Sequence, residues 1–503
     1  MPDLERQHYL AEIERLTKLT DMLTSTINAQ TETIAAQTET IAEMTAKIEA
    51  LQQMVKELTE QVKKDSHNSS KPPSSDGYGK KPNPKSLRER SGRKQGGQKG
   101  HSGKNMSIPH EPDEVKTHFP DKCLRCHNLA ECISNETLKA CDDARYVVDV
   151  VVSTYVTKHQ VIAADKCPEG GSGLSGNFPE DIKAYVQYGD SVAVLTGLLS
   201  TYGAMSMNRI HVLLGSLMGV SLSTGTIASM VKKCAQKVGP CMKKVQKLLQ
   251  SSDVCCFDET GTRTGGKLWW VHNSSTKHLT YLSINRKRGK PGIDDNGVLP
   301  IFSGVAMHDC WGPYWKYEDV LHAVCNAHLL RELTGIAENN PEHTWAPEFK
   351  KLLFNMKKTK DKAVARGKTK LRGYFLYEFS KEYDRIMKLA DSECPKPYSN
   401  LPRRRGRKKK GKERALIERL QLLKGSVCLF INDFNVPFDN NQAERDLRNV
   451  KTKTKVAGCF RTEEGARNYL DVMSYISTGN KHGVSAFDAL TSAFAGNAEI
   501  ILQ

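Results

Sequence analysis

The first 64 residues carry an apolar side chain at every seventh position, and this repeat constrains the fold more than any other feature. Isoleucine or valine at one repeat position with leucine three residues later predicts a parallel two-stranded coiled coil. Gln30 and Gln37 fall on the leucine register, where burial costs stability and can fix register or oligomer state. The two registers are Ile13, Thr20, Ile27, Ile34, Ile41, Ile48, Val55 and Val62, and Leu16, Leu23, Met44, Leu51 and Leu58.

The segment AQTETIA at 29–35 is repeated at 36–42, so the heptad itself is duplicated. An antiparallel hairpin within one chain is the alternative to self-association. No glycine or proline turn signal interrupts the pattern, which favours one continuous helix. We therefore predict a homodimer or a higher oligomer formed through residues 1–64.

The chain has 503 residues and a net charge of +17, which favours a polyanionic partner such as DNA. Its 14 cysteines are too few for a disulfide scaffold, and no secretory signal is expected at the charged N-terminus. The longest apolar stretch, around 210–222, is too short to span a bilayer. These features exclude secreted scaffolds and membrane proteins, and predict a cytoplasmic protein with no membrane partner.

Two basic segments interrupt the chain. Residues 65–118 begin with proline, serine and glycine and continue with scattered cations, which predicts a flexible arm lying against DNA or, alternatively, a solvated linker. A second run at 403–412 either follows a phosphate backbone or is a disordered, solvated block. The candidate DNA-binding residues are Arg88, Arg90, Arg93, Lys94 and Lys99 in the arm, and Arg403, Arg404, Arg405 and Arg407 in the run.

Cys123 and Cys126 form a C-x2-C pair, a spacing that suits two tetrahedral zinc ligands. Cys167 is the best third candidate, but a second pair would need a cysteine where the chain has Gly170. Residues 119–175 are thus either a zinc-finger-like module or a metal-free relic of one. Residues 180–249 read as helical, and the run 223–226, which begins with Ser223, predicts the N-cap of a second helix. A glycine break at Gly219 is compatible with a helix-turn-helix and equally with a packed helical hairpin.

Acidic residues follow two apolar, strand-like runs in the second half of the chain. Asp258 ends the run 254–257, and Asp309 ends the run 304–308. Strand patterns at 268–271 and 278–284 lie between them, and another follows at 322–325. This order of acids and strands is that of an RNase H-like nuclease core. Glu259 adjoins Asp258 but would point to the opposite face, which predicts a supporting role.

Glu444 lies near the start of a predicted helix, after a largely helical insertion at about 335–430. With Asn441 as N-cap, Glu444 would complete a capping box, so capping and catalysis are rival explanations. Asp433, Asp439 and Asp446 are competing candidates for the third acid. Arg448, Lys451 and Lys455 share its helical face, a stripe that suits a helix beside DNA. Two aspartates and a glutamate at one point could hold two Mg²⁺ or Mn²⁺ ions for in-line displacement at phosphorus.

Several strings resemble DDE transposases of the insertion-sequence-66 group. They occur in the family's order from the arm to the C-terminal region. They are NSSKPPSSDG (68–77), RKQGGQKGH (93–101), DET (258–260), HDCWGPYWKY (308–317), CNAHLLREL (325–333), PFDNNQAERDLRNVK (437–451) and GCFRTEEGARNY (458–469). The family's Gly-Tyr after the second aspartate is replaced here by Cys310-Trp311.

The resemblance implies that Asp258, Asp309 and Glu444 are the catalytic triad of a nucleoid-associated bacterial transposase. It also implies that accessory proteins from the same element take part. The predicted fold is multidomain α+β. It comprises a coiled coil (1–64), a basic arm (65–118), a zinc-finger-like module (119–175), a helical region (180–249), an RNase H-like α/β domain with the helical insertion (250–475) and a helical tail (476–503).

The predicted activity is cleavage of the element's ends and joining of their 3′-hydroxyl groups to target DNA. A nuclease of the same fold that lacks strand transfer is one alternative. A dimeric DNA-binding regulator without catalysis is another. A binding-competent but inactive transposase is a third, although all three acids are present.

Overall fold

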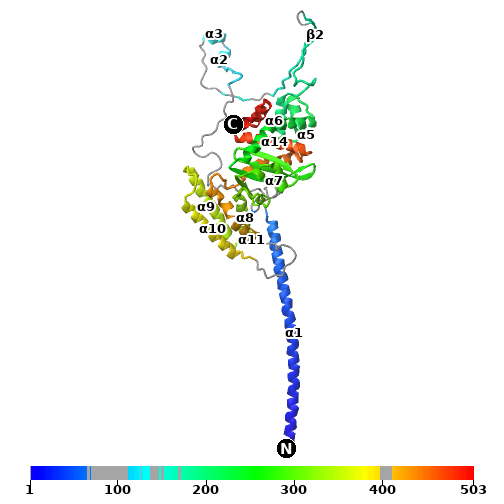
Figure 1. The fold of residues 1–503 in the computed structure, drawn as a ribbon, viewed down its shortest axis with the longest axis vertical. Helices are drawn as coiled ribbons and strands as arrows, with labels where there is room; N and C mark the ends of the chain where they lie inside the picture. Colours follow the sequence, from blue (N-terminus) through cyan, green and yellow to red (C-terminus); the bar gives the residue numbers. More distant parts are fainter. Residues whose placement is uncertain are drawn as a thin grey trace. The chain divides into compact units, whose positions relative to one another are not determined.

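The computed structural model describes residues 2–64, 68, 111–119, 121–125, 127–135, 145, 147–148, 152–167, 171–396 and 411–503. Contacts divide the chain into two compact units, Met1–Pro84 with Ala323–Asp439, and Lys85–His322 with Asn440–Gln503. The described part is α+β and mostly helical, with one mixed five-stranded sheet (Figure 1). Within it, no helix is both long and apolar enough to cross a membrane.

The N-terminal helix α1 (Pro2–Val62) is continuous, as the heptad pattern predicts (Figure 1). Its apolar stripe faces solvent in the single chain: Ile27, Ile34 and Ile41 are 59%, 62% and 61% exposed. Threonine hydroxyls along the helix donate to carbonyls one turn back, as Thr31 does to Ile27. The helix thus satisfies its polar groups locally but leaves its apolar stripe uncovered by the described residues.

The predicted insertion is helical in the first unit. Trp345, Phe349 and Tyr383 are fully buried and form its core. Their polar ends are satisfied: the Tyr383 hydroxyl donates to the Leu420 carbonyl at 2.7 Å, and Trp345 Nε1 donates to Glu413 at 2.6 Å. The helices are α8 (Asn326–Asn339), α9 (Trp345–Ala365), α10 (Gly373–Glu393), α11 (Lys412–Leu422) and α12 (Lys424–Asn432).

The five-stranded sheet has the order β5-β4-β3-β6-β7. The first three strands in sequence form an antiparallel meander, and β6 then pairs parallel to β3 on its other side. All five predicted strand regions are present, and the first strand is longer than its apolar run. The strands are β3 (Val254–Thr264), β4 (Lys267–Ser275), β5 (Thr280–Asn285), β6 (Val305–His308) and β7 (Leu321–Val324).

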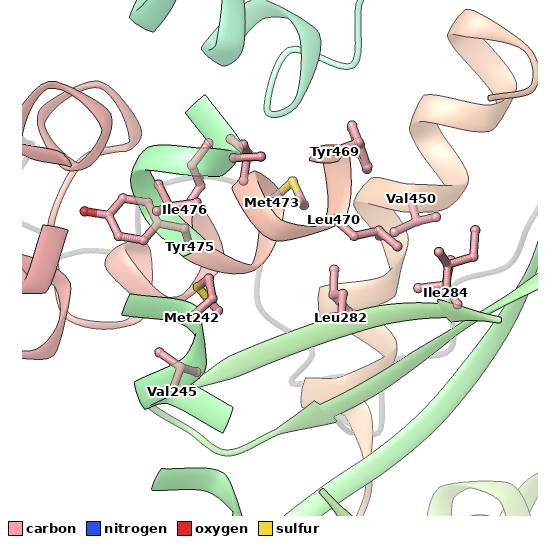
Figure 2. Close-up of a cluster of buried hydrophobic side chains, with 14 of the residues drawn as sticks. Met242, Val245, Leu282, Ile284, Val450, Tyr469, Leu470, Met473, Tyr475 and Ile476 are labelled. Carbon is pink, nitrogen blue, oxygen red and sulfur yellow. The ribbon is translucent and has the colours of Figure 1, made fainter. Parts of the chain in front are cut away.

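Helix α14 (Glu463–Lys481) covers the edge strand β5. The Ser474 hydroxyl accepts from the Leu282 N–H at 2.9 Å, and the Thr478 hydroxyl accepts from the Thr280 N–H at 3.1 Å. These hydroxyls replace the neighbouring strand that β5 lacks, and so block edge-to-edge pairing. Figure 2 shows Leu282 and Leu470 facing each other across this contact.

Helix α6 (Thr224–Gln250) supplies ten buried residues to the same core, including Cys234, Val238 and Val245. Figure 2 places its Met242 and Val245 beside α14. Ser223 caps α6 through the Thr226 N–H at 3.0 Å, as its sequence predicts. Helices α4 (Asp190–Ser200), α5 (Met207–Met218) and α15 (Ala486–Phe494) complete this helical layer.

Shorter elements connect these parts. They are α2 (Asp121–Leu124), α3 (Leu129–Ser134), β1 (Ala163–Cys167), β2 (Gly171–Ser175), α7 (Lys290–Asn296), η2 (Leu299–Ile301), η3 (Tyr314–Lys316) and η4 (Ala498–Leu502). Strands β1 and β2 pair antiparallel. Helix α14 runs through the domain boundary that the sequence places at 475.

Candidate active site

Asp258 and Asp309 lie at equivalent points of two neighbouring parallel strands. The pairing of β3 with β6 matches Cys256 to Met307. Extending this register by two residues sets Asp258 opposite Asp309. Both acids are partly exposed. Asp309 directly follows β6, whereas Asp258 lies within β3, just past its pairing with β6, because β3 continues to Thr264 as the partner of β4. The two acids that the sequence separates by fifty positions are therefore adjacent at one edge of the sheet.

Backbone amides orient both carboxylates. The Glu259 N–H donates to Asp258 Oδ1 at 2.9 Å, and the Trp311 N–H donates to Asp309 Oδ1 at 2.9 Å. The buried Tyr314 ring lies close to both acids. Burial raises the pKa of its phenol, and the charges of Glu259, Asp258 and Asp309 raise it further. Three carboxylates thus surround one neutral hydroxyl group.

Glu444 lies in the first turn of helix α13 (Asn441–Ala457), and this turn contacts the strands near Asp258. Asn440, its N-cap, donates from its side chain to the Phe257 carbonyl at 2.8 Å, one residue before Asp258. Asn273 of β4, which pairs with Asp258, donates to the Ala443 carbonyl at 3.1 Å, one residue before Glu444. The first turn of α13 is therefore anchored on β3, which carries Asp258, and on the neighbouring strand β4.

The structure separates the two rival roles of Glu444. The N-cap is Asn440 rather than Asn441, and its side chain makes no capping bond. The N3 position of a capping box therefore belongs to Ala443, and Glu444 lies one position beyond it. The expected cap at Asn441 is thus wrong by one residue, because the Asn440 side chain bonds to β3 instead of to its own helix.

Asp446 was a competing candidate on the same helix, but it has a structural contact. Its carboxylate accepts from the Lys481 amine at 2.8 Å, and both side chains are at least 90% buried. It also accepts from Thr280 Oγ1 at 3.1 Å and from Gln442 Nε2 at 3.1 Å. Removing one member of such a buried pair typically costs about 3–5 kcal/mol. Asp446 therefore joins α13 to α14 and β5.

Glu259 has the supporting role that the sequence predicts, and it has a partner that the sequence did not reveal. Its side chain is 2% exposed, and Arg288 donates to it through Nε at 2.9 Å and Nη2 at 2.6 Å. The Tyr314 hydroxyl donates to its other oxygen at 2.5 Å. Burial nevertheless raises the pKa of Glu259. The only signal of Arg288 in the sequence is the basic turn at 285–292, which has no periodic pattern.

The histidine and aromatic residues at the end of β6 and just after it pack against one another instead of forming an open surface. His308 is fully buried and stacks on Tyr314 with ring centroids 4.7 Å apart. Its Nε2 lies 2.8 Å from Nδ1 of His322. Burial lowers the pKa of His308 to about 3, so this imidazole is neutral at physiological pH. Trp315 packs on the His322 ring at 4.6 Å. This packing supports the segment that carries Asp309.

The DNA-binding candidates divide into two groups. The arm residues Arg88, Arg90, Arg93, Lys94 and Lys99 and the run Arg403, Arg404, Arg405 and Arg407 lie outside the described residues. The stripe on α13 is described: Arg448 and Lys455 are exposed, and Lys451 is half-buried. Within the described ranges none of these three forms an ion pair, so their charges remain available to an external anion.

The two predicted metal sites have different outcomes. Cys126 lies outside the described residues, as do the side-chain surroundings of Cys167, so the zinc prediction is not tested. Cys123 is a free, partly exposed thiol. Across the described residues no group of three His, Cys, Asp or Glu side chains is arranged to hold a metal ion. The described residues therefore do not show a formed metal site at Asp258, Asp309 and Glu444, and their role as metal ligands stays a prediction.

The helix pair α5–α6 contains the break expected at Gly219, which caps α5 with φ 65°. Ile210 and Leu214 of α5 are buried, whereas Leu217 is 55% exposed. Because α6 packs in the core along most of its length, only its exposed face is open to a DNA groove. A helix-turn-helix role for this pair stays a prediction.

The family comparisons agree with the resemblance in the motifs. The model of the family described as "Transposase IS66 family" matches residues 193–468, which is more than half of the chain. The chain therefore belongs to the IS66 family of transposases, and membership implies that it acts on DNA in transposition. A second model, "Family of unknown function (DUF6444)", matches residues 11–107, most of α1 and the basic arm. A search of the curated proteins finds no match.

Proposed function

We propose that this transposase cleaves the ends of its element and joins their 3′-hydroxyl groups to target DNA, with Asp258, Asp309 and Glu444 as the catalytic acids. The observation that carries the proposal is the point on β3 where its pairing with β6 ends. The register of the two strands, extended by two residues, sets Asp258 opposite Asp309, and Asn440 and Asn273 anchor the first turn of α13 beside Asp258.

The sheet order supports an RNase H-like core. If the strands are numbered in chain order, their order across the sheet is third, second, first, fourth and fifth. Adjacent strands among the first three are antiparallel, and the fourth is parallel to the first. In such a sheet the first and fourth strands are central neighbours. An acid within the first strand and an acid just after the fourth are then held by the centre of the sheet.

The donor set fits hard divalent cations. Carboxylate oxygens are the ligands that Mg²⁺ prefers, and Mn²⁺ accepts them as well. Each aspartate accepts a backbone N–H through one oxygen, and this bond orients its carboxylate. Two bound ions would stabilise the attacking and the leaving oxygens of an in-line displacement.

The remaining residues hold the substrate and the acids. Arg448, Lys451 and Lys455 continue along the helical face of Glu444 and would contact phosphates on either side of the cut. The hydrogen bond from the Tyr314 hydroxyl to Glu259 joins the segment after β6 to β3 and so would stabilise the positions of Asp258 and Asp309. The arm and the 403–412 run add charge for long-range DNA attraction, and α1 would pair two chains so that two element ends are held together.

A strand-transfer assay tests the proposal. Labelled duplexes with the terminal sequences of the encoding element are incubated with Mg²⁺ and a plasmid target. We expect joined product from the wild type and a loss of about 10³-fold or more in Asp258→Asn, Asp309→Asn and Glu444→Gln. Glu464→Gln at the exposed start of α14 is the matched control and should remain active.

Other outcomes separate the alternatives. Cleaved but unjoined ends would indicate a nuclease of the same fold. Joined product from Glu444→Gln would move the third ligand to another acid. End binding without cleavage, even with the element's accessory proteins added, would favour a DNA-binding regulator.

A further inference from the structure

Arg288 is held between two indole rings next to the candidate acids. Its guanidinium carbon lies 4.7 Å from the Trp270 ring centroid and 4.1 Å from that of Trp311. Both of its hydrogen bonds from Nε and Nη2 end on one oxygen of Glu259. The Glu259 side chain is 2% exposed, yet that of Arg288 is 41% exposed. The ion pair is therefore buried on the acid side and open on the guanidinium side.

The loop that carries Arg288 has a fixed shape. The Lys287 N–H donates to Asn285 Oδ1 at 2.8 Å, and His272 Nε2 lies 3.3 Å from the Lys287 carbonyl oxygen. A Cβ atom on Gly292 would lie 2.2 Å from that oxygen and 2.3 Å from His272 Nε2. Only glycine allows the chain to pass there, so the loop closes tightly against β4.

The same cluster touches both aspartates of the site. Glu259 follows Asp258 directly, and its N–H orients the Asp258 carboxylate. Trp311, whose ring packs against Arg288, donates its backbone N–H to Asp309 Oδ1. Arg288 therefore lies on the border of the junction where the scissile phosphate is expected.

We propose that Arg288 binds a DNA phosphate adjacent to the scissile one, an inference that rests on the proposed function. Two tryptophan rings pack against the guanidinium, which leaves less of its planar surface for a base to stack on. Its edge remains: Nη1 has no hydrogen-bond partner among the described residues, and the guanidinium has five N–H donors in a planar fork. Such a fork matches the two oxygens of a phosphate.

The position also explains why a cation is placed there. The catalytic acids repel DNA phosphates, and an Arg288 edge directed outward offsets that repulsion at one neighbouring phosphate. Arg286 and Lys287 are exposed on the same loop and add to the local positive potential. They are less constrained than Arg288, because no aromatic ring among the described residues packs on either side chain.

Single methylphosphonate substitutions test the contact. End duplexes with one neutral phosphate at each position around the cut are bound to the wild type and to Arg288→Gln, with Ca²⁺ in place of Mg²⁺. We expect Arg288→Gln to bind about tenfold more weakly, with a salt slope smaller by ~0.9. At one phosphate, neutralisation should weaken DNA binding by the wild type but not by Arg288→Gln. The proposal would be overturned if the effects of neutralisation and of the substitution on binding add at every position.

Two further variants keep the test decisive. Arg467→Gln on α14 removes an arginine of similar exposure that pairs with Glu463. In this variant, neutralising each phosphate should change DNA binding as much as it does in the wild type. Because Arg288→Gln leaves Glu259 buried without its cation, the double variant Glu259→Gln/Arg288→Gln provides a charge-free pair. It should lose the same coupling while melting near the wild-type temperature.

The closing comparison separates this contact from the proposed chemistry. If the wild type binds with one coupled phosphate but forms no joined product with its accessory proteins present, the proposed function fails and the Arg288 contact stands. If the wild type forms joined product and Arg288→Gln shows additive phosphate effects, the contact fails and the proposed function stands.

Discussion

Helices α1 and α6 start from the same kind of pattern and end in opposite environments. Both are long and carry an apolar stripe. In α6, Ile227, Val238 and Val245 are 0% exposed, because α14 and the sheet cover them. In α1, Ile13 and Ile48 are 59% and 55% exposed. The difference shows that the periodicity of the sequence predicts a helix and its apolar stripe but does not predict which element covers that stripe.

The stripes also differ in kind. The α6 stripe mixes cysteine, methionine, alanine and valine, which suits an irregular surface of strands and helices. The α1 stripe repeats strictly every seven residues with isoleucine dominant, which suits a second copy of the same helix. A stripe without a partner in its own chain is the expected state of half a coiled coil.

Val238→Asp in α6 should give the largest effect. It places a carboxylate where the side chain is fully buried, and the cost should be roughly 4 kcal/mol or more. Thermal unfolding of the purified protein, or its recovery in inclusion bodies, measures this. A variant that melts near the wild-type temperature would show that the α6 stripe is not the core that its burial indicates.

The double variant Ile34→Asp/Ile41→Asp in α1 makes the same chemical change on an exposed stripe. We expect the loss of self-association without a loss of folding in the catalytic unit. Light scattering after size exclusion should give the mass of one chain, against at least two for the wild type. Glu39→Gln, on the same helix and outside both registers, serves as the control. An unchanged mass in the double variant contradicts the coiled-coil prediction.

Gln30→Leu with Gln37→Leu should strengthen the coiled coil. Each glutamine occupies a position that leucine fills elsewhere, and its replacement should add about 1 kcal/mol per site through buried apolar area. Circular dichroism of a peptide covering residues 1–64 should show a higher melting temperature. Light scattering will show whether the oligomer number also changes. A lower melting temperature would place the two glutamines on the outer face.

Asp471 on α14 should give a smaller, pH-dependent effect. Burial raises its pKa to about 6 from an ordinary value of 3.8. A raised acid pKa means that the folded state prefers the protonated form. Stability is therefore lost as pH rises from about 4 to 6. Asp471→Asn should be more stable by about 1 kcal/mol at pH 7 and equal to the wild type below about pH 4.

Melting temperatures at pH 4, 5, 6 and 7 check this sign. Asp21→Asn on the exposed α1 should match the wild type at every pH. A difference for Asp471→Asn that does not change with pH would show that its carboxyl is solvated in the folded state.

Much of the fold was predictable because it depends on local pattern. The heptads predicted α1, and the apolar runs predicted β3 to β7. The Ser223 cap predicted the start of α6. Local rules were less reliable where a side chain has a distant partner. Asn440 is the clearest case, since its bond to Phe257 moves the start of α13 by one residue from the expected cap.

The candidate site shows the same division. The sequence by itself determined that Asp309 follows a strand, which helix carries the third acid and which charges share that helical face. It did not show that β3 continues past Asp258 to Thr264, because the later part of that strand lacks an apolar run. Only the tertiary structure decided that Asp258 and Asp309 are in register and that Asp446 belongs to Lys481. Only it placed Arg288 between two tryptophans. The physical reason is range: strand and helix patterns arise from neighbours within a few residues, whereas register and ion pairing join residues that only the folded chain brings together.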